Sequence, residues 1–158
     1  MYAHPGKKLN FMGNEIGQLR EWDEKREQDW MLLDYPVHEG FAHFMRDLNK
    51  LYLEHSAFWE KDYSADGFQW IDCHQESKCI YVFQRNGKKE SIISLFNFSD
   101  QEQDYELNLP GVDKIRELLN SNLAVYGGSQ KRKGGVKTLK NGKIVLTLPA
   151  YSSVYYMI

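Results

Sequence analysis

Hydrophobic positions change their spacing near residue 60 of this chain. Before that point they recur every three or four residues, and after it they alternate with polar positions every second residue. The first spacing is that of an amphipathic helix, and the second is that of a β-strand with one buried face. We therefore expect a mainly β fold, with a helical part over residues 1–60 and an antiparallel β-domain over residues 61–158.

The strongest helical pattern covers roughly residues 36–55. Its polar face is charged, and Pro36 suits the first turn of a helix because the missing N–H is not needed there. The apolar face must be buried against another element, and we assign its aromatic rings to core packing. This face consists of Val37, Phe41, Phe44, Met45, Leu48, Leu51 and Tyr52.

Short alternating segments fill the second part of the chain. An Asn-Gly pair between two such segments is a strong hairpin signal. Asn86-Gly87 and Asn141-Gly142 both meet this condition, so each predicts a hairpin. Short, closely spaced strands of this kind form a small antiparallel sandwich or barrel. The predicted strands lie at residues 80–83, 92–98, 105–109, 115–119, 136–139, 144–148 and 154–157.

The N-terminal part contains a different kind of strand signal. A short apolar run, Leu9–Met12, leads into Gly13 and then into a polar cluster. Parallel α/β folds place site residues at the carboxyl ends of buried strands in this way. No earlier strand is present to pair with this one. The charge-rich stretch that follows, Arg20–Leu33, predicts a loop with a helical turn or two.

Composition narrows the function classes. The formal net charge is −2 and there is no basic stripe, which argues against nucleic acid as a partner. Lys131–Lys133 lies between glycines and is interpreted as a solvated loop tip. Cys73 and Cys79 are interpreted as small buried residues of strands, because two cysteines are too few for a disulfide framework. We see no membrane span or signal peptide, and we expect a cytoplasmic protein.

The carboxylates give no catalytic pair. Retaining sugar cleavage needs two carboxyl groups about 5–5.5 Å apart. Glu15 with Glu21, or Asp23 with Asp29, are candidates, but no spacing singles out either pair. The histidines are scattered and show no metal-ligand spacing, so we expect neither a metal nor a cofactor.

Tryptophan is the remaining candidate for chemistry, because its ring can stack on a sugar. Most tryptophans in so aromatic a chain are expected in the core. Trp22 is the exception that we favour, since it follows the polar cluster within a charged loop. Trp59 and Trp70 flank the change from helix to sheet, and we expect them to join the two parts.

Several motifs, in order along the whole chain, resemble a known family. Residues 12–18, Met-Gly-Asn-Glu-Ile-Gly-Gln, followed by Arg20-Glu21-Trp22, are similar to the last barrel strand and loop of glycogen branching enzymes, which belong to the α-amylase superfamily (glycoside hydrolase family 13). The later motifs, which follow in the same order, are Asp29-Trp30-x-Leu32-Leu33, Arg46-Asp47-Leu48-Asn49, Asp66-Gly67-Phe68-Gln69-Trp70-Ile71, Asn97-Phe98-Ser99, Glu117-Leu118-Leu119-Asn120-Ser121 and residues 146–152.

The resemblance implies a place in a larger architecture. Such enzymes have an N-terminal β-sandwich, a central (β/α)8 barrel and a C-terminal all-β domain, and a barrel alone takes about 250 residues. Residues 1–60 would then be the last strand, loop and helix of a truncated barrel, so that the predicted helix is a remnant of it. Residues 61–158 would be the C-terminal all-β sandwich.

The resemblance also implies an activity for the parent enzyme. It would cleave an α-1,4 bond of a glucan and transfer the fragment to a 6-hydroxyl, forming an α-1,6 branch. The family's catalytic carboxylates lie on earlier strands, and no position here matches them. We therefore expect no catalytic residue and no activity in this chain alone. Asn14, Glu15 and Trp22 are the substrate-proximal candidates, with an α-glucan as partner.

Two other functions stay open. The chain could be an independent glucan-binding module whose exposed rings supply affinity, or the tail of another superfamily member such as a debranching or maltogenic enzyme. One structural expectation follows from truncation. The backbone of Leu9–Met12 has no barrel neighbours, so we expect residues 1–35 to be poorly ordered, rearranged, or paired with another copy of the chain.

Overall fold

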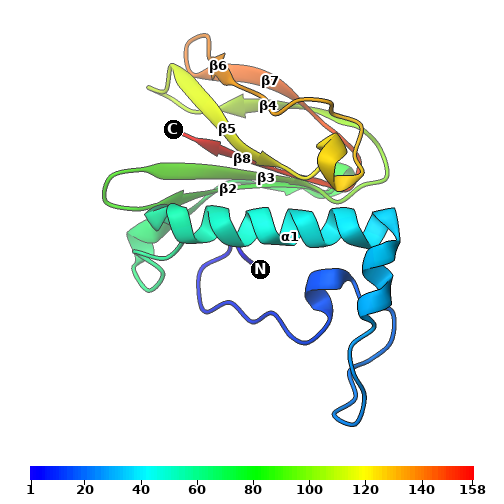
Figure 1. The fold of residues 1–158 in the computed structure, drawn as a ribbon. Helices are drawn as coiled ribbons and strands as arrows, with labels where there is room; N and C mark the ends of the chain where they lie inside the picture. The colour runs from blue at the N-terminus through cyan, green and yellow to red at the C-terminus, as the bar shows by residue number, and fades with distance from the viewer.

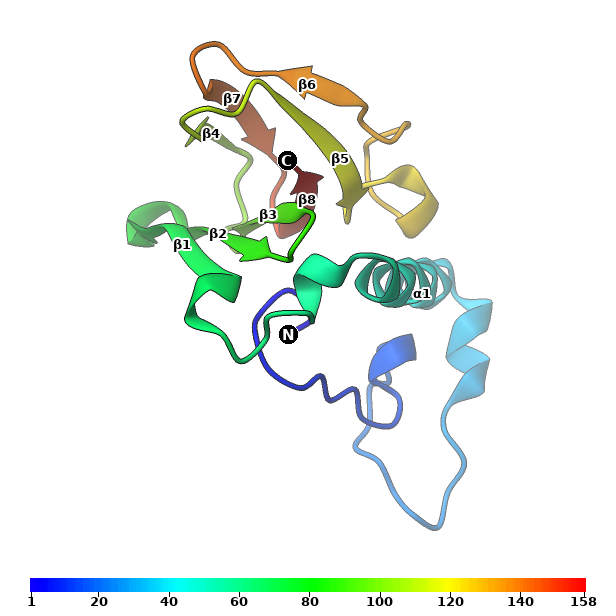
Figure 2. The ribbon, with the colours of Figure 1, turned by 90° about the vertical axis from the view of Figure 1, so that its left-hand side faces the viewer.

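The fold has three layers, seen in a computed structural model that describes residues 1–158. A six-stranded antiparallel sheet, in the order β1-β2-β3-β8-β5-β6, forms the middle layer. A two-stranded sheet, β4-β7, covers one of its faces, and the helix α1 lies along the other (Figure 1). Figure 2, which looks along α1, shows the N-terminal segment on the far side of the helix from the small sheet.

The expected mainly β fold with one long helix is therefore confirmed. The helix α1 is Pro36–Glu54, close to the predicted 36–55. Short 3-10 turns connect the elements, among them η1 (Asn14–Ile16), η2 (Trp30–Asp34) and η6 (Ala124–Tyr126). The strands are β1 (Phe68–Gln75), β2 (Ile80–Asn86), β3 (Ser91–Asn97), β4 (Gln103–Asn108), β5 (Lys114–Asn120), β6 (Val136–Thr138), β7 (Lys143–Leu148) and β8 (Ser152–Met157).

The middle sheet is buried on both faces, so the chain has two hydrophobic cores. Alternate residues of β2 serve the two sides: Val82 lies in the core between the sheets, and Phe83 lies in the core beneath α1. The second core also includes Tyr2 and Ala3 from the N-terminal segment. Residues from both sides of position 60 therefore share one core, and the division into two domains at that point stays a prediction.

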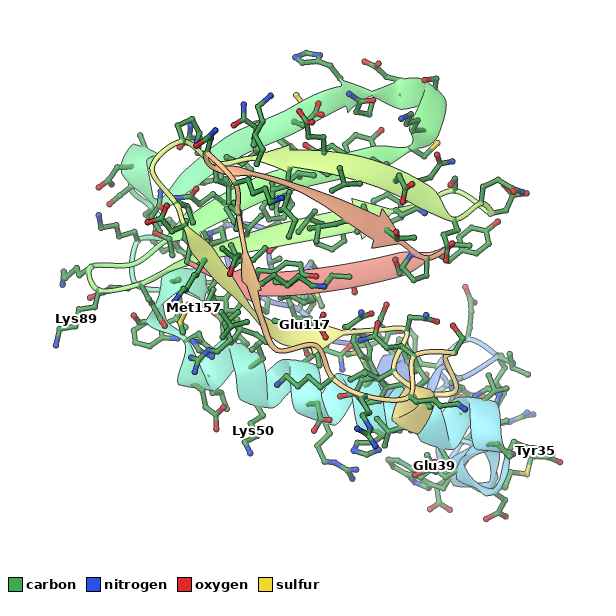
Figure 3. All side chains as sticks on the ribbon, turned by 90° about the horizontal axis from the view of Figure 1, so that it is seen from above. Tyr35, Glu39, Lys50, Lys89, Glu117 and Met157 are labelled. Carbon is green, nitrogen blue, oxygen red and sulfur yellow. The ribbon has the colours of Figure 1, made fainter.

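The helix is held against the sheet by a close contact with η6. A Cβ added to Gly40 would lie 2.8 Å from the carbonyl oxygen of Tyr126, so only glycine fits there. The Tyr126 hydroxyl donates a hydrogen bond to Asp47 Oδ2 at 2.5 Å, about two turns further along the helix. Glu39 and Lys50 extend outward from the helix at the edge of the molecule (Figure 3). None of the helices combines the length and the apolar character that crossing a bilayer requires.

One predicted hairpin is confirmed and the other is wrong. β2 and β3 pair across the turn that begins after Asn86, as predicted. Asn141 and Gly142 do form a tight turn, with φ of 52° and 75°. However, β6 pairs with β5 and β7 pairs with β4, so the chain passes from one sheet to the other at this turn. Buried Leu139, just before the turn, lies in the core between the two sheets.

The predicted strand at Leu9–Met12 is absent. These residues form an irregular segment, and Leu9 is 74% exposed. A strand needs a neighbour to accept its backbone hydrogen bonds, and nothing in the chain provides one here. The expectation that residues 1–35 are poorly ordered, rearranged or paired with another copy of the chain stays a prediction.

The interpretation of the cysteines was wrong in detail. Neither Cys73 nor Cys79 is fully buried, and both are free thiols. Cys73 lies in β1, the edge strand of the large sheet, where one side of the strand has no neighbour. Cys79 lies outside any strand, in a left-handed conformation that ends the turn before β2.

Candidate functional site

The polar cluster after Gly13 forms a compact turn fixed to the helix. Gly13 and Gly17 flank η1 with φ of 86° and 64°, a conformation that favours glycine. Ile16 between them is buried, and its carbonyl oxygen accepts a hydrogen bond from His38 Nδ1 at 2.8 Å. Because His38 belongs to the first turns of α1, the position of η1 is coupled to the helix.

A side-chain network then closes the charged loop that follows. Arg20 Nε donates to both carboxylate oxygens of Asp29, at 3.0 and 2.9 Å. The amide oxygen of Gln18 accepts a hydrogen bond from the Asp29 backbone N–H at 3.0 Å. Gln18 packs close to Gly13: a Cβ added to Gly13 would lie 2.8 Å from the Cβ of Gln18. The loop from residue 20 to residue 29 is thus held at its base by its own residues.

The predicted site residues lie on this turn and loop. Asn14 is exposed and Glu15 is half-buried, and neither side chain makes a hydrogen bond within the chain. Trp22 is 49% exposed and meets Phe11 edge-to-face, with ring centroids 5.5 Å apart. Trp22 lines a shallow depression with Gln18 and the loop, too small for a sugar ring, and Asn14 and Glu15 do not line it. The three candidates therefore do not form a pocket by themselves.

An apolar surface surrounds these residues. Large hydrophobic side chains on the N-terminal segment, on η2 and at the start of α1 are exposed. Exposed apolar side chains gathered on neighbouring segments are typical of a place where another protein surface or a ligand sits. The residues are Leu9, Phe11, Met12, Leu19, Trp22, Trp30, Met31, Leu33, Tyr35, Val37 and Phe41, and we call them the N-terminal apolar surface.

The prediction that Trp59 and Trp70 join the helical and β parts was wrong. Both indoles are half-exposed, and Trp70 packs edge-on against Phe68 and Phe83 at the surface of the sheet. The structure assigns the joining role to Arg85 of β2, which sequence reasoning missed. The sequence did contain a signal for its burial. Arg85 lies two residues after Phe83, so the two side chains share the strand face that is buried beneath the helix.

Arg85 is completely buried and binds three separate segments. Its guanidinium donates to the carbonyl oxygens of Ala3 at 2.9 Å, Phe58 at 2.9 Å and Gly67 at 3.3 Å. It also forms an ion pair with Asp62. Lys8 lies 4.0 Å from the same carboxylate, and burial together with the nearby Arg85 charge lowers the pKa of Lys8 although Asp62 opposes the shift.

A second polar contact ties the end of α1 to the β2–β3 turn. His55 Nδ1 and Glu90 Oε2 are 2.9 Å apart, and the Ala57 backbone N–H donates to Glu90 Oε1 at 3.3 Å. Burial raises the pKa of Glu90, but the hydrogen bonds from His55 and Ala57 outweigh it, so the pKa lies below its ordinary value. No three His, Cys, Asp or Glu side chains lie close enough together to hold a metal ion.

Comparison with known proteins places these features in a family. The family model described as "Alpha amylase, C-terminal all-beta domain" matches residues 70–158. The 1,4-alpha-glucan branching enzyme GlgB of Oceanobacillus iheyensis is 41% identical over 132 residues, which is 82% of this chain and 21% of that protein. The enzyme of the same name from Aquifex aeolicus is 39% identical over 165 residues, which is 98% of this chain and 26% of that protein.

The structural comparison agrees on the fold. The crystal structure of AmyP in complex with maltose matches 76% of this chain with a TM-score of 0.58, at 13% sequence identity and over 20% of its own length. The chain spans about a fifth to a quarter of the length of the curated relatives that it matches. With a matching family model over most of its β-domain and a matching sandwich fold, the chain belongs to the family of alpha-amylase C-terminal all-β domains.

Proposed function

We propose that this chain is the C-terminal part of a 1,4-α-glucan branching enzyme and that it completes and supports the catalytic barrel of that enzyme. The observation that carries the proposal is its identity of about 40% with branching enzymes over nearly its whole length. The match extends through residues 1–69, which precede the all-β family model, so it covers more than a sandwich shared by many amylases.

The N-terminal apolar surface supports this role. Apart from Trp22, its ten large hydrophobic side chains would be buried by a barrel packed on this surface. Leu9–Met12, irregular here, would gain strand neighbours on both sides in such a barrel. Arg85 and its carbonyl partners would then connect the barrel segment rigidly to the sandwich.

In this proposal the η1 turn and the following loop form one wall of the substrate cleft. Asn14 and Glu15 have free polar atoms for sugar hydroxyls, and Trp22 has an exposed ring face for a glucose unit. The Gln18–Arg20–Asp29 network holds these groups in position before substrate binds. We assign no catalytic residue to the chain and place the enzyme in the cytoplasm, where its two free thiols would stay reduced.

The reaction proposed for the whole enzyme conserves the number of glycosidic bonds. One α-1,4 bond breaks and one α-1,6 bond forms, with a covalent glycosyl-enzyme between the two steps. The carboxylates for both steps would come from the rest of the barrel.

A chimaera tests the proposal. The matching C-terminal quarter of the Aquifex aeolicus relative is replaced by this chain, and branching of amylose is measured by loss of iodine absorbance and by chain-length analysis after debranching. We expect a folded chimaera that branches amylose at a rate within about tenfold of the parent, since core and interface must readjust. A chimaera that folds but forms no α-1,6 bonds would overturn the proposal. The chain by itself should show no activity.

A further inference from the structure

The two Asn-Gly pairs of the chain differ in how their reactive atoms are held. Asparagine is a chemically labile residue, because the backbone nitrogen of the next residue can attack its side-chain amide. Glycine in the next position favours this attack, since it has no Cβ to hinder the approach. Asn86-Gly87 lies in the turn between β2 and β3, and Asn141-Gly142 lies in the turn that leads into β7.

The side chain of Asn86 is fixed by hydrogen bonds at both of its polar atoms. Its Nδ2 donates to the Asp66 carbonyl oxygen at 3.0 Å. Its Oδ1 accepts hydrogen bonds from Gln84 Nε2 at 2.6 Å and from Ser91 Oγ at 2.8 Å. Asn86 is also half-buried. The amide therefore cannot turn toward the backbone nitrogen of Gly87 unless these bonds break.

The attacking nitrogen of this first pair is engaged as well. The Gly87 N–H donates to the Glu90 carbonyl oxygen at 2.9 Å. Gly87 also packs against the 3-10 turn η3 (Ser56–Phe58), where an added Cβ would lie 3.1 Å from the Ala57 nitrogen. Both reacting groups of Asn86-Gly87 are thus held by the fold.

The same groups are free in Asn141-Gly142. Asn141 is exposed and its side chain makes no hydrogen bond within the chain, and the Gly142 N–H donates to no acceptor. Positive φ at both residues is typical of a two-residue hairpin turn. This turn is closed by two backbone bonds, from Lys140 N–H to Lys143 O at 2.9 Å and from Lys143 N–H to Lys140 O at 3.0 Å. Neither bond restrains the Asn141 amide.

We propose that Asn141 is a site of spontaneous deamidation and that the contacts of Asn86 protect it from the same reaction. The Gly142 nitrogen attacks Asn141 Cγ, its proton passes through solvent to Nδ2, and the Cγ–Nδ2 bond breaks to release ammonia. The product is a cyclic imide, a succinimide. Water then opens this ring: attack at Cγ gives aspartate, and attack at the backbone carbonyl carbon gives isoaspartate, in which the main chain runs through Cγ.

The modification changes the connection between the two sheets. The Gly142 carbonyl oxygen accepts a hydrogen bond from the Leu109 N–H at 2.7 Å, and a Cβ added to Gly142 would lie 2.5 Å from the Leu109 carbonyl oxygen. The turn therefore fits closely against the β4–β5 connection. Isoaspartate lengthens the main chain by a carbon, so this fit and the two bonds between Lys140 and Lys143 cannot all be kept. We expect the isoaspartyl chain to have a lower melting temperature.

The test uses the whole 158-residue chain, incubated in mildly alkaline buffer and sampled over time. Mass spectrometry of its proteolytic peptides measures deamidation at each asparagine, and electron-transfer fragmentation distinguishes isoaspartate from aspartate. We expect Asn141 to react at least about tenfold faster than Asn86, because Asn86 must first lose several hydrogen bonds. In the chain unfolded by urea the two rates should be similar. Equal rates in the folded chain, a faster reaction at Asn86, or the same difference in urea would each overturn the proposal.

Two variants test the protection and the consequence, with circular dichroism as the check on folding. Gln84→Ala with Ser91→Ala removes both hydrogen bonds to Asn86 Oδ1 and should speed deamidation at that position. An unchanged rate in this folded variant would overturn the role of these contacts. Asn141→Gly suits the positive φ and has no amide to lose, so its melting temperature should stay constant during incubation while that of the unchanged chain falls. An equal fall in both would show that the modification does not loosen the turn.

Discussion

Arg85 and Asp62 form an ion pair in the interior of the protein, where the guanidinium is inaccessible to solvent. Burying an arginine is costly unless its donors are satisfied. Here one carboxylate balances the charge, and carbonyl oxygens from three separate segments accept the remaining hydrogen bonds. The pair therefore fixes the N-terminal segment and the α1–β1 connection to the sheet.

Removing Asp62 should destabilise the fold strongly. In Asp62→Ala the arginine stays buried with its charge unbalanced, and we expect a loss of about 3–5 kcal/mol in the free energy of unfolding. Urea denaturation followed by circular dichroism measures it. The matched control is Asp66→Ala, which breaks an exposed pair with Lys61 and should cost less than about 1 kcal/mol. Equal losses for the two variants would contradict this account of Arg85.

Alanine at Gly40 should destabilise the protein although it favours the helix. Alanine is better than glycine in a helix by about 1 kcal/mol. At this position its Cβ would meet the Tyr126 carbonyl oxygen at 2.8 Å, so the helix must move away from η6. We expect a lower melting temperature for Gly40→Ala and almost no change for Gly135→Ala, where a Cβ meets nothing within 4 Å. A rise in melting temperature for Gly40→Ala would show that the contact can relax.

Trp22 should affect substrate binding in the chimaera. If its exposed face stacks on a glucose unit, Trp22→Ala removes a contact worth about 1 kcal/mol and raises KM for amylose about fivefold. Tyr63→Ala is the control, because Tyr63 is 81% exposed and lies outside the N-terminal apolar surface. Unchanged kinetics in Trp22→Ala would remove this residue from the substrate-proximal set.

Stability should fall in acid through Glu90. Its pKa in the folded chain is below the ordinary value of 4.5, so the folded state favours the ionised carboxylate. The stabilisation is therefore complete above pH 4.5 and is lost as the pH falls through the lower, folded pKa. Urea midpoints measured between about pH 6 and about pH 3 should fall less in Glu90→Gln than in the unchanged chain. If the urea midpoints of the two proteins fall equally with pH, the acid sensitivity belongs to other carboxylates.

The isolated chain should self-associate through the N-terminal apolar surface. Leu19 is 82% exposed and Met31 is 67% exposed, and neither has a partner within the chain. Sedimentation velocity should show concentration-dependent dimers or larger species, and these should disappear in a variant with Leu19→Glu and Met31→Glu. A chain that stays monomeric at high concentration would indicate that the surface is too dispersed to associate.

The sequence predicted the local elements well and their partners poorly. The helix at 36–54 follows from its 3.6-residue period and Pro36, and β2 and β3 follow from alternation and Asn86. The pattern around Asn141-Gly142 identified the turn but not that its two strands belong to different sheets. A period specifies which face of a strand is buried, and it carries no information on which strand lies beside it.

The contacts within the candidate site could not be predicted from the sequence either. Gly13 and the polar cluster were visible in the sequence, whereas the bonds of Gln18 and Arg20 to Asp29 join side chains across a loop that has no periodic pattern. A groove beside the start of α1 is lined by Val37 and Phe41 of the helix and by Tyr151 and Ser153, more than a hundred positions later. Only the three-dimensional packing of the helix on the sheet brings them together.

The place of β8 in the middle of the large sheet has a consequence for how the protein is made. β8 lies between β3 and β5, and every other strand of the sheet is synthesised before it. During translation β5 and β6 therefore leave the ribosome before β8, the strand that joins them to β3. The six-stranded sheet cannot form completely until β8 has been synthesised. We expect the nascent sandwich to depend on chaperones over this interval, and a stop codon before residue 152 to leave a chain that cannot fold.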